Sequence, residues 1–456
     1  MVSSFSNVSD NFLESLSSID ETYLNDFNIN KVKECLIDYL AALLAGKSIV
    51  SDKLLAFLSI NNFSDIDVDK IIIYNNLSLE NQVYITGFTS HAAELDDGSR
   101  FGMIHPGAPL FSLLLPVARK GIIPFHQLAL ATMVGYEASV RLAMAIAPGH
   151  YARGYHPTAT CGTIGAALGL CKLLKQNKHV FKNALSVSSV SASGSLKVIE
   201  DDSQIKPLNV ANASLNALYA VRAGMSGFNG ANDALGGSTG FLTMMTDQWS
   251  FDKLVRKYDD NLMIHSVYFK PFAACRHAHA PIEGALKLRN ILGDKLDYID
   301  TINVYVYDTI IGKHDNKTIN GSSSAKMSIP YAVAVAITSG MAGIEAFEEP
   351  WLNNTTMRTL LDKVNVIPDE NFSKLVPEKR CSRVEIVLSD NTVINETVEY
   401  AKGEPENPME LGDLFGKLQS NLNPNCKVSV EEIHQAIKMV DETPFLFYQI
   451  LEKLEI

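Results

Sequence analysis

The stretch TIGAALGLCKLLK, which covers Thr163–Lys175, decides the fold class of this protein. Leu and Ala favour helices, and the small residues Gly165, Ala166, Ala167 and Gly169 predict close packing against a neighbouring helix. A phosphate-binding loop is the other interpretation of these glycines. The chain, however, contains no GxxxxGK followed by Ser or Thr, and no GxGxxG after a strand. We therefore expect closely packed helices and no nucleotide cofactor.

Helical spacing continues on both sides of this stretch. Apolar residues recur at i, i+3, i+4 and i+7 within Val32–Leu43, and the Ala-rich window Ala129–Ala147 favours a helix by propensity as well. The pattern persists to about Ser250. The first part of the chain is therefore predicted to be a helical domain.

The character of the sequence changes after about Lys270. Ile299–Ile311 alternates in the manner of a strand. Two further β-branched runs, Arg383–Leu388 and Thr392–Tyr400, are separated by polar turn residues and predict a hairpin. Helices are predicted at Ala280–Leu292 and Ser328–Gly340. This mixture of strands and helices is typical of an α+β domain.

The end of the chain returns to amphipathic helices. Pro408–Leu422 and Ser429–Asp441 have helical spacing, and Ser429 with Glu432 forms a capping box. The predicted fold is mainly α with an inserted α+β domain, that is, a large all-helical domain plus a small α+β lid domain. We expect these parts to cover residues 1–268 and 269–404, with residues 405–456 returning to the helical domain.

Composition and charge exclude several classes of function. The 456 residues contain 39 Lys and Arg against 51 Asp and Glu, and a net charge of −12 opposes binding to phosphate backbones and anionic membranes. The six cysteines are dispersed without a CxxC pair, which argues against a zinc ribbon and against a disulfide framework. The N-terminus has no signal-peptide pattern, and the most apolar stretches are too short or too charged to span a bilayer. We expect a cytoplasmic protein that binds neither nucleic acid nor a membrane.

The first of five polar places is HAAELDDGSRFGMIHPG, residues His91–Gly107. Its Gly and Pro residues predict a loop between helices, where functional side chains concentrate. The candidates in this loop are Glu94, Asp97, Arg100 and His105. A solvated acidic turn at a helix end is the structural alternative.

His156 and Lys206 are the next two candidates. His156 lies in the segment GYHPT, just before a predicted helix that Thr158 or Thr160 would cap, and an anion is favoured at such an N-terminus. Lys206 precedes an Ala-rich, probably buried helix at Ala211–Ala223. Taken alone, such a His is more often structural, and such a Lys is more often solvated.

The fourth place is KPFAACRHAH, residues Lys270–His279, at the predicted domain junction. Arg276, His277 and His279 stand among apolar residues, which is hard to explain as a solvated face. The His-x-His pattern is compatible with a metal pair, but no HExxH and no further ligand set follows it. The other interpretation is a cationic pocket in which Arg276 binds a carboxylate through two hydrogen bonds.

The fifth place is AKMSIPYAVA, residues Ala325–Ala334, in which Tyr331 begins an apolar helix. A buried tyrosine hydroxyl needs a partner. A catalytic pocket and an ordinary protein core are equally able to supply one.

Together these five places resemble the MmgE/PrpD family, which includes 2-methylcitrate dehydratases, cis-aconitate decarboxylases and an iminodisuccinate epimerase. The resemblance runs from about Lys31 to Leu451. Six motifs carry it in the same order as in the family: HAAELDDGSRFGMIHPG, GYHPTATCGTIGAA, KPLNVANAS, KPFAACRHAHAPIEGA, SSAKMSIPYAVAVAITSG and KGEPENP. Each motif is modest alone, and the set of six is specific.

The resemblance implies a homodimer with a metal-free active site between the helical domain and the lid, without any other cofactor. By position in the motifs, it implies catalytic roles for His105, His156, Lys206, His279 and Tyr331. Both His277 and His279 are candidates for the junction histidine, and the spacing to the following helix favours His279. The residues assigned to substrate binding are Glu94, Asp97, Arg100, Arg276 and His277. Where dehydratase and decarboxylase members usually read Asp-Phe-Asp-Asp-Thr, this chain reads ELDDG from Glu94 to Gly98, and that loop lines the family's pocket.

The reactions of the family share one difficulty, which is negative charge that develops beside a carboxylate. Lys, His and Arg side chains in a water-poor cleft stabilise such charge. The expected function is that of a metal-independent lyase acting on a small di- or tricarboxylate, in which His105 or His156 moves a proton and Tyr331 or Lys206 donates one. Dehydration of the 2-methylcitrate type is the first expectation, and decarboxylation of cis-aconitate or epimerisation of iminodisuccinate are the alternatives. A non-catalytic carboxylate-binding protein and a metal-dependent hydrolase are alternatives from other classes.

Overall fold

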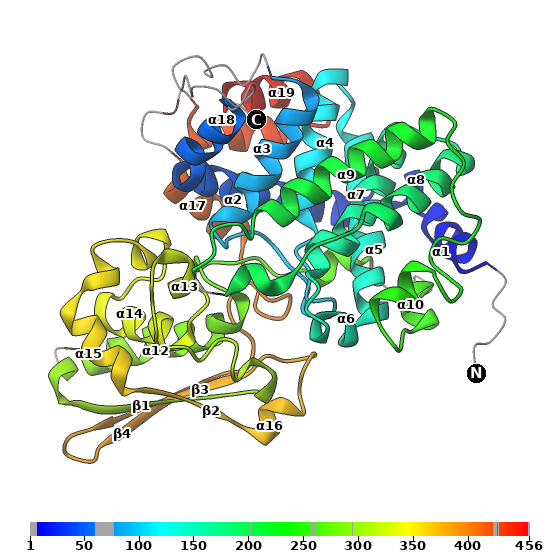
Figure 1. Cartoon of the computed structure of the whole chain (residues 1–456). Helices are drawn as coiled ribbons and strands as arrows, with labels where there is room; N and C mark the ends of the chain where they lie inside the picture. The colour runs from blue at the N-terminus through cyan, green and yellow to red at the C-terminus, as the bar shows by residue number, and fades with distance from the viewer. Residues whose placement is uncertain are drawn as a thin grey trace.

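The computed structural model describes residues 7–59, 77–200, 202–256, 261–293, 295–422, 426 and 428–454. The chain forms a large helical part and a smaller α+β part that lies to one side of it (Figure 1). The fold is therefore mainly α with a small α+β domain, as the sequence predicts.

The helical part contains fourteen α-helices within the described residues. They are α1 (Val8–Ser17), α2 (Asp26–Ser59), α3 (Leu79–Ala92), α4 (Gly107–Gly121), α5 (Phe125–Ile146), α6 (Gly149–Ala152), α7 (Pro157–Leu173), α8 (Lys178–Ser191), α9 (Leu208–Met225), α10 (Phe241–Met245), α11 (Phe251–Leu254), α17 (Leu411–Asn421), α18 (Val430–Lys438) and α19 (Pro444–Lys453). Helix α7 lies at the centre and packs against α4, α5, α8 and α9. The predicted capping box of Ser429 and Glu432 is present at the start of α18.

The predicted close packing of the Thr163–Lys175 stretch is present between α7 and α5. A Cβ atom added to Gly165 would lie 2.5 Å from the Cβ of Ser139 and 2.8 Å from the carbonyl oxygen of Gly135. A Cβ atom added to Gly169 would lie 3.1 Å from the carbonyl oxygen of Ala131 in α5 and 2.7 Å from a methyl carbon of Leu110 in α4. The small residues therefore bring two backbones together, as the sequence predicts.

Helix α5 is the one described helix that is long and apolar enough to cross a membrane by length and composition. In this fold 94% of its most apolar window is buried inside the protein. It also contains a buried ion pair in which Arg141 Nε lies 2.6 Å from Glu137 Oε1. Glu137 Oε2 accepts a hydrogen bond of 2.7 Å from the backbone N–H of Met263. These contacts identify α5 as a core helix.

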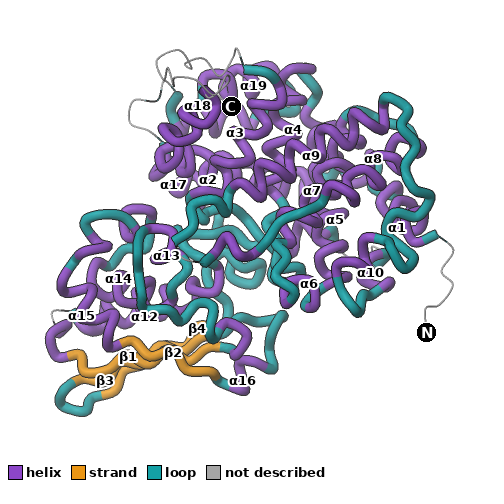
Figure 2. The backbone as a smooth tube through the Cα atoms, viewed as in Figure 1, coloured by secondary structure: helices purple, strands orange, loops and turns teal. Residues whose placement is uncertain are grey.

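The α+β part is a four-stranded sheet with helices on one face (Figure 2). Its elements are α12 (His279–Leu292), β1 (Ile299–Val306), α13 (Ser322–Lys326), α14 (Ile329–Ser339), α15 (Thr355–Lys363), β2 (Val364–Pro368), α16 (Glu370–Ser373), β3 (Ser382–Leu388) and β4 (Val393–Val398). The strand order is β2-β1-β3-β4, in which β2 runs parallel to β1 and the other pairs are antiparallel. Buried and less buried residues alternate along β1 and β3, because one face packs against the helices.

Strand β2 is the element of this sheet that the sequence analysis missed. It has only five residues, Val364–Pro368, and it begins at the residue after α15 ends. A run this short, ending in proline and without a preceding turn, gives little period-2 signal. Tertiary pairing with β1 decides its conformation.

The described residues form two large hydrophobic cores and one small cluster. The larger core is built from the helical part, and it includes Leu414 of α17 and Leu451 of α19. The smaller core belongs to the α+β part, but Ala42 of α2 and Leu95 also contribute to it, so the two parts share packed side chains. Helix α17 contacts α2, and the C-terminal helices thus lie beside the N-terminal ones (Figure 1). The exact boundaries at residues 268 and 404 stay predictions.

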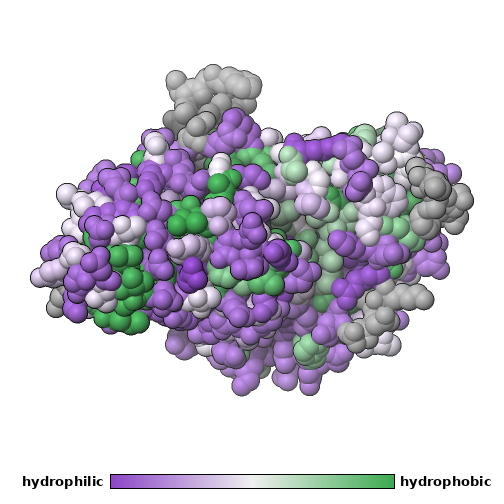
Figure 3. Space-filling view, turned by 90° about the horizontal axis from the view of Figure 1, so that it is seen from below, coloured by the Kyte–Doolittle hydropathy of each residue, from purple (hydrophilic) through white to green (hydrophobic). Residues whose placement is uncertain are grey.

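The surface of the molecule is mixed, and one face of it is mostly hydrophilic with small apolar patches between polar side chains (Figure 3). Fifteen large apolar side chains are exposed among the described residues. Two of them, Phe57 and Ile205, lie close to the junction of the two parts.

Candidate active site

A small cavity of about 60 Å³ lies where the helical part meets the α+β part. It is lined by Glu94, Met103, His105, Tyr151, His156, Leu196, Ile199, Lys206, Tyr268, Cys275, Arg276, His277, His314, Met327 and Arg380. Six of the ten predicted site residues are in this set, and they come from segments far apart in the sequence. The structure therefore brings most of the predicted polar places together.

The loop between α3 and α4 is held in place by its own acidic and basic residues. Asp97 accepts hydrogen bonds from the backbone N–H of Gly107 (3.0 Å) and from the hydroxyl of Tyr136 (2.5 Å). Arg100 donates to Glu404 at 2.8 Å and also pairs with Glu406. Neither Asp97 nor Arg100 lines the cavity. They position the loop instead.

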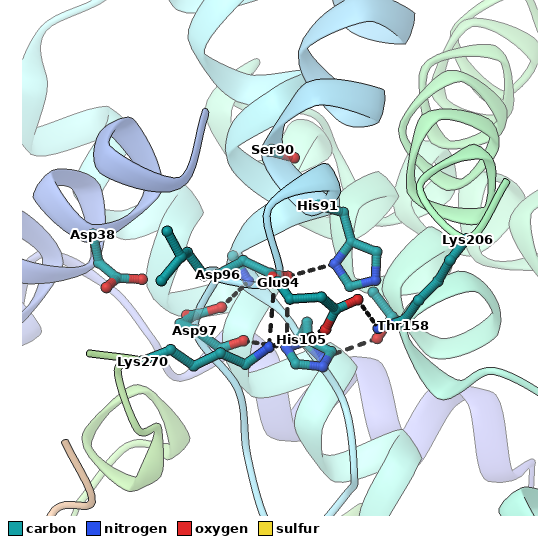
Figure 4. Close-up of polar contacts among 12 residues, drawn as sticks. Asp38, Ser90, His91, Glu94, Asp96, Asp97, His105, Thr158, Lys206 and Lys270 are labelled. Atoms are coloured by element: carbon teal, nitrogen blue, oxygen red, sulfur yellow. Dashed lines mark hydrogen bonds and ion pairs between the residues drawn. The ribbon is translucent and has the colours of Figure 1, made fainter. Parts of the chain in front are cut away.

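Glu94 is the carboxylate that reaches the cavity from this loop, and two lysines surround it (Figure 4). Its Oε1 forms a short contact with Lys206 Nζ, and its Oε2 lies 3.4 Å from Lys270 Nζ. Burial alone would raise the pKa of Glu94, but Lys206 and Lys270 outweigh burial and hold the pKa well below its ordinary value. The Glu94 backbone is left-handed, with φ of 57°, a conformation that costs energy for a residue other than glycine.

His91 and Asp96 are buried beside this ion pair, and the partly exposed His105 forms a cluster with them (Figure 4). His91 Nδ1 lies 2.7 Å from Asp96 Oδ2, and the rings of His91 and His105 have centroids 5.2 Å apart. His105 Nδ1 lies 2.5 Å from the carbonyl oxygen of Asp97. Since a carbonyl oxygen only accepts, Nδ1 of His105 carries a proton. Burial lowers the pKa of His105 to about 3, so its ring is neutral and its Nε2 has a free lone pair.

His156 has the opposite tautomer. It is the N-cap residue of α7, and Asn209 Nδ2 donates to its Nδ1 at 3.1 Å. Burial, together with the neighbouring cationic groups, holds the pKa of His156 well below its ordinary value. A neutral ring that accepts at Nδ1 carries its proton on Nε2. His105 therefore offers an acceptor and His156 a donor.

The N-terminus of α7 differs from the prediction in one respect. The helix begins at Pro157, and its N-cap residue makes no side-chain capping bond, so neither Thr158 nor Thr160 is the cap. Thr158 Oγ1 instead accepts from the backbone N–H of His105 at 3.0 Å, and Thr160 Oγ1 lies 2.8 Å from His150 Nε2. Proline at the first helical position needs no partner for an N–H group, which explains this start. Thr158 ties the loop with His105 to α7.

Arg276 reaches the cavity, but its guanidinium is already paired. It donates to Glu404 Oε1 from Nη2 at 2.9 Å and from Nε at 3.1 Å, and it also donates to the carbonyl oxygens of Phe269 and Lys402. Glu404 thereby bridges Arg276 and Arg100. Glu404 therefore takes the place that the sequence analysis expected a substrate carboxylate to have beside Arg276.

His279 is not the junction histidine of the cavity. Its Nε2 donates to the carbonyl oxygen of Ala274 at 3.1 Å, and its Nδ1 accepts from Arg276 at 3.1 Å. The side chain is fully buried and lines no part of the cavity. The spacing argument that favours His279 over His277 is therefore misleading, because the turn at residues 276–278 directs His277 to the cavity.

Tyr331 also lies outside the cavity. Its hydroxyl donates to the carbonyl oxygen of Ala346 at 2.9 Å, and its ring packs against Phe347 in the core of the α+β part. The expectation that Tyr331 shares a pocket with His156 and Lys206 is not met. The sequence left two possible settings for this hydroxyl, a catalytic pocket and the protein core. The structure places it in the core.

Cys275, His277 and His314 form a second cluster on the α+β side. The Sγ of Cys275 lies 4.0 Å from His314 Nε2, while His314 Nδ1 donates to the carbonyl oxygen of Met327 at 3.0 Å. His277 Nδ1 forms a short contact with the hydroxyl of Tyr307. Burial would raise the pKa of Cys275, but His314 outweighs burial and lowers the pKa to about 7.

These three residues are the grouping that could hold a metal ion among the described residues. Their ligand atoms all lie within 4.8 Å of one another. Thiolate and imidazole ligands suit zinc.

Arg380 supplies a further positive charge to the cavity. It donates to the carbonyl oxygen of Arg100 at 3.2 Å, and among the described residues no carboxylate lies within ion-pair distance of its guanidinium. An arginine without a carboxylate partner in a cavity is suited to bind the carboxylate of a ligand.

The sequence analysis missed several residues of this site. Lys270 stands in a motif that carries the resemblance, and its buried ammonium is evident only from the fold. His91 and Asp96 stand in the first polar motif, and a His five residues before an Asp has no diagnostic meaning in itself. Arg380 and His314 stand in no motif, so no signal in the sequence could have found them.

Comparisons with known proteins agree with the resemblance. A model of the MmgE/PrpD N-terminal domain matches residues 17–254, and a model of the MmgE/PrpD C-terminal domain matches residues 272–443. The two matches together cover most of the chain.

Individual relatives are distant. A cis-aconitate decarboxylase-like protein of Aspergillus oryzae is 22% identical over 422 residues, which is 86% of either chain. The cis-aconitate decarboxylase of Mus musculus is 24% identical over 385 residues, or 79% of this chain and 75% of that protein. A 2-methylcitrate dehydratase-like protein of Aspergillus oryzae is 24% identical over 220 residues, which is 44% of either chain. These names support an enzyme, and a lyase, at the level of the family.

Proposed function

Because this chain belongs to the MmgE/PrpD family, we propose that it is a metal-independent lyase that dehydrates a small hydroxylated di- or tricarboxylate. One observation supports this more than any other: a neutral histidine with a free lone pair, His105, and a neutral histidine with a free N–H, His156, line the same cavity as Lys206. Dehydration requires a base, a donor to the developing oxyanion and an acid.

In the proposed reaction His105 Nε2 removes the proton next to a carboxylate. The C–H electron pair becomes the new C=C bond as the C–O bond breaks, and the Lys206 ammonium protonates the leaving hydroxyl to give water. His156 Nε2–H donates a hydrogen bond to the carboxylate as it gains negative charge, which a neutral imidazole can do without losing its proton. Arg380 binds a second carboxylate. Proton exchange with water then restores His105 and Lys206.

Decarboxylation is the second candidate, and the relatives favour it. The proteins that match over three quarters or more of their length are named cis-aconitate decarboxylase or decarboxylase-like. Loss of CO₂ leaves a carbanion, which needs a proton donor and fixed positive charge but no base. Lys206, His156 and Arg380 meet that need as well.

Proton NMR in D₂O separates the candidate reactions. The purified protein is incubated with 2-methylcitrate, citrate, cis-aconitate and iminodisuccinate in turn. We expect 2-methylcitrate to lose water, so that the signal of its C–H beside the methyl group disappears and the methyl doublet becomes a singlet on the new double bond. CO₂ loss from cis-aconitate would instead establish the second candidate. Deuterium exchange without net conversion would indicate an epimerase. Binding without exchange or conversion of any compound would contradict both proposals and indicate a non-catalytic carboxylate-binding protein.

Single substitutions test the assigned roles. We expect His105→Ala, His156→Ala and Lys206→Ala each to lower kcat by about 10²–10⁴-fold, with circular dichroism spectra like that of the wild type. Tyr331→Phe is the matched control, because its hydroxyl contacts a core carbonyl group. It should retain kcat within a few-fold of wild type. Near wild-type turnover in the first three variants would show that the assignment is wrong.

The metal-free character is part of this proposal. Dialysis against a chelator should leave kcat unchanged, and elemental analysis should find no stoichiometric metal. Loss of activity together with loss of one ion per chain would instead favour the cluster of Cys275, His277 and His314 as a catalytic metal site. The expected homodimer and cytoplasmic location also remain proposals, and analytical ultracentrifugation tests the first of them.

A further inference from the structure

A second, larger pocket of about 560 Å³ opens beside the cavity. Four residues line both spaces: Glu94, Ile199, Lys206 and Met327. The Lys206–Glu94 ion pair thus stands at the junction of the two. Whatever occupies the cavity can continue into this pocket, which we call the α2–α3 groove.

Apolar side chains make up just over half of the lining of the α2–α3 groove, and polar ones, among them Lys53, Lys326 and Glu348, line the rest. The apolar residues include Ile49, Val50, Leu54 and Phe57 of α2, Tyr84 and Phe88 of α3, Val198, Ile205 and Pro207 before α9, and Leu208 at its start. The rings of Phe57 and Tyr84 stack with centroids 5.6 Å apart. Phe57 and Ile205 are 56% and 54% exposed, so the groove presents apolar surface that a ligand could cover.

The size of the cavity requires the substrate to extend beyond it. A space of about 60 Å³ holds only a few water molecules, and a tricarboxylate is larger than that. Two neighbouring pockets adjoin the cavity. Both contain charged side chains, but the other one, of about 600 Å³, has few large apolar ones besides Leu196, Ile199 and Met327, and its remaining lining suits water and polar groups. The α2–α3 groove suits a hydrocarbon chain.

We propose that the substrate of this enzyme is a polycarboxylate with an unbranched alkyl chain, whose carboxylates lie in the cavity and whose chain lies in the α2–α3 groove. The inference rests on the proposed function. Lys206, which protonates the leaving hydroxyl in the proposed reaction, would lie where the chain leaves the cavity, while the apolar walls would exclude water from the chain. A volume of about 560 Å³ lies within the usual range for small-molecule sites.

A series of 2-alkylcitrates with methyl, ethyl, butyl and hexyl chains tests this inference. We expect kcat/KM to rise by about fourfold for each added methylene until the groove is filled, since each methylene leaves water. A flat series with good turnover of 2-methylcitrate would overturn the inference and leave the proposed function intact.

One substitution and its matched control locate the effect. Phe57→Asp places a charge on the groove wall, and it should lower the hexyl-to-methyl ratio of kcat/KM at least tenfold. Phe445→Asp on α19 changes an aromatic side chain of the same exposure, 57%, far along the sequence from the groove residues, and it should keep the wild-type ratio. An equal hexyl-to-methyl ratio of kcat/KM in both variants would show that the alkyl chain does not lie in the α2–α3 groove.

Calorimetric binding of 2-hexylsuccinate, succinate and decanoate gives a readout that needs no turnover. We expect 2-hexylsuccinate to bind more tightly than either of the others, because it alone fills both spaces. If it does so while no compound is converted, the proposed lyase function fails and the inference about the groove stands. Tighter binding of decanoate would overturn the assigned class in favour of a plain fatty acid, and equal binding of hexylsuccinate and succinate would overturn the groove itself.

Discussion

His105 and His156 have the same side chain and opposite hydrogen-bonding capacity. A backbone carbonyl group fixes the proton of His105 on Nδ1, and the amide of Asn209 fixes that of His156 on Nε2. Neither partner stands next to its histidine in the sequence. Whether each histidine serves as base or donor therefore cannot be predicted from the motifs HPG and GYHP, since it depends on contacts that only the fold creates.

The pH profile of the enzyme follows from the lowered pKa of His105. A base with an ordinary histidine pKa near 6.5 would lose activity below that pH. Because burial lowers the pKa of His105 to about 3, the base is expected to stay unprotonated at pH 5.5 and above. We expect kcat/KM to show no decline around pH 6.5 when measured from pH 5.5 to 8. A clear acid limb near pH 6.5 would contradict this protonation state.

Cys275 is expected to be the thiol most reactive toward alkylation. Its pKa is lowered to about 7, whereas burial raises the pKa values of Cys161 and Cys171 to about 12. Since the thiolate is the nucleophile, the rate of iodoacetamide labelling should rise with a midpoint near pH 7, as followed by peptide mass spectrometry. His314→Gln should move this midpoint upward, because the cation that stabilises the thiolate is removed. A wild-type midpoint at 8.5 or above would show that the pair with His314 is not formed.

At the scale of elements, eight helices and three of the four strands among the described residues could be predicted from periodicity and caps. The hairpin of β3 and β4, helix α14 and the capping box of α18 all lie where the sequence places them. The first residue of a helix is harder to predict. Helix α7 begins at Pro157, before Thr158 and Thr160, which the sequence analysis expected to cap it. A helix end depends on which contacts satisfy its unpaired groups, and these are often supplied from elsewhere in the chain.

Substitution at Gly165 tests the contact between α5 and α7. A Cβ atom there would lie within 3.0 Å of three atoms of α5, so Gly165→Ala should lower the free energy of unfolding by about 1–3 kcal/mol in urea titrations. Gly416→Ala in α17 is the control, because a Cβ atom there meets nothing within 4 Å. It should leave stability unchanged or raise it by about 1 kcal/mol, since alanine favours a helix. A stable Gly165→Ala protein would mean that the helices can separate.

At the scale of the whole molecule, buried neutral histidines make stability depend on pH. The pKa of His150 is lowered to about 4 and that of His105 to about 3, while an unfolded chain binds protons near pH 6.5. Below about pH 6.5 the unfolded state therefore binds more protons than the folded state, and stability falls as pH falls. The pKa of Asp97 is raised to about 7, so the folded state binds a proton there that the unfolded state lacks. This makes stability rise as pH falls from 7 to about 4, and it offsets the effect of one histidine.

We therefore expect the free energy of unfolding to be largest above pH 6.5 and to decrease by roughly 1.4 kcal/mol per pH unit for each uncompensated histidine down to about pH 4. Denaturant titrations at pH 7.5, 6.5, 5.5 and 4.5 measure this slope. His150→Gln should make the slope shallower, because it removes one of the groups whose pKa is lowered by folding. His150 binds Thr160 within the helical part and lies outside the cavity. A flat profile from pH 7.5 to 4.5 would contradict the neutral state of these rings.

The assembly of the site also belongs to the whole molecule. The sequence predicts five polar places, and the fold brings parts of all five to one cavity, although the fifth contributes Met327 while Tyr331 stays in the core of the α+β part. Arg380 and His314 join the cavity from segments without any motif. Sequence patterns can reveal unusual polar segments, but the choice of side chain that reaches the shared space is made by the packing of the two parts.

The return of α17, α18 and α19 to the N-terminal helices has a consequence for biosynthesis. Leu414, Ile433 and Leu451 complete the hydrophobic core that Phe12 and Leu36 begin, yet they leave the ribosome only after the whole α+β part. A nascent chain must therefore hold an unfinished helical body, with apolar surface open to chaperones, until these helices have been made. A truncated transcript that loses these last helices would yield a protein whose α+β part can fold while its larger core cannot close.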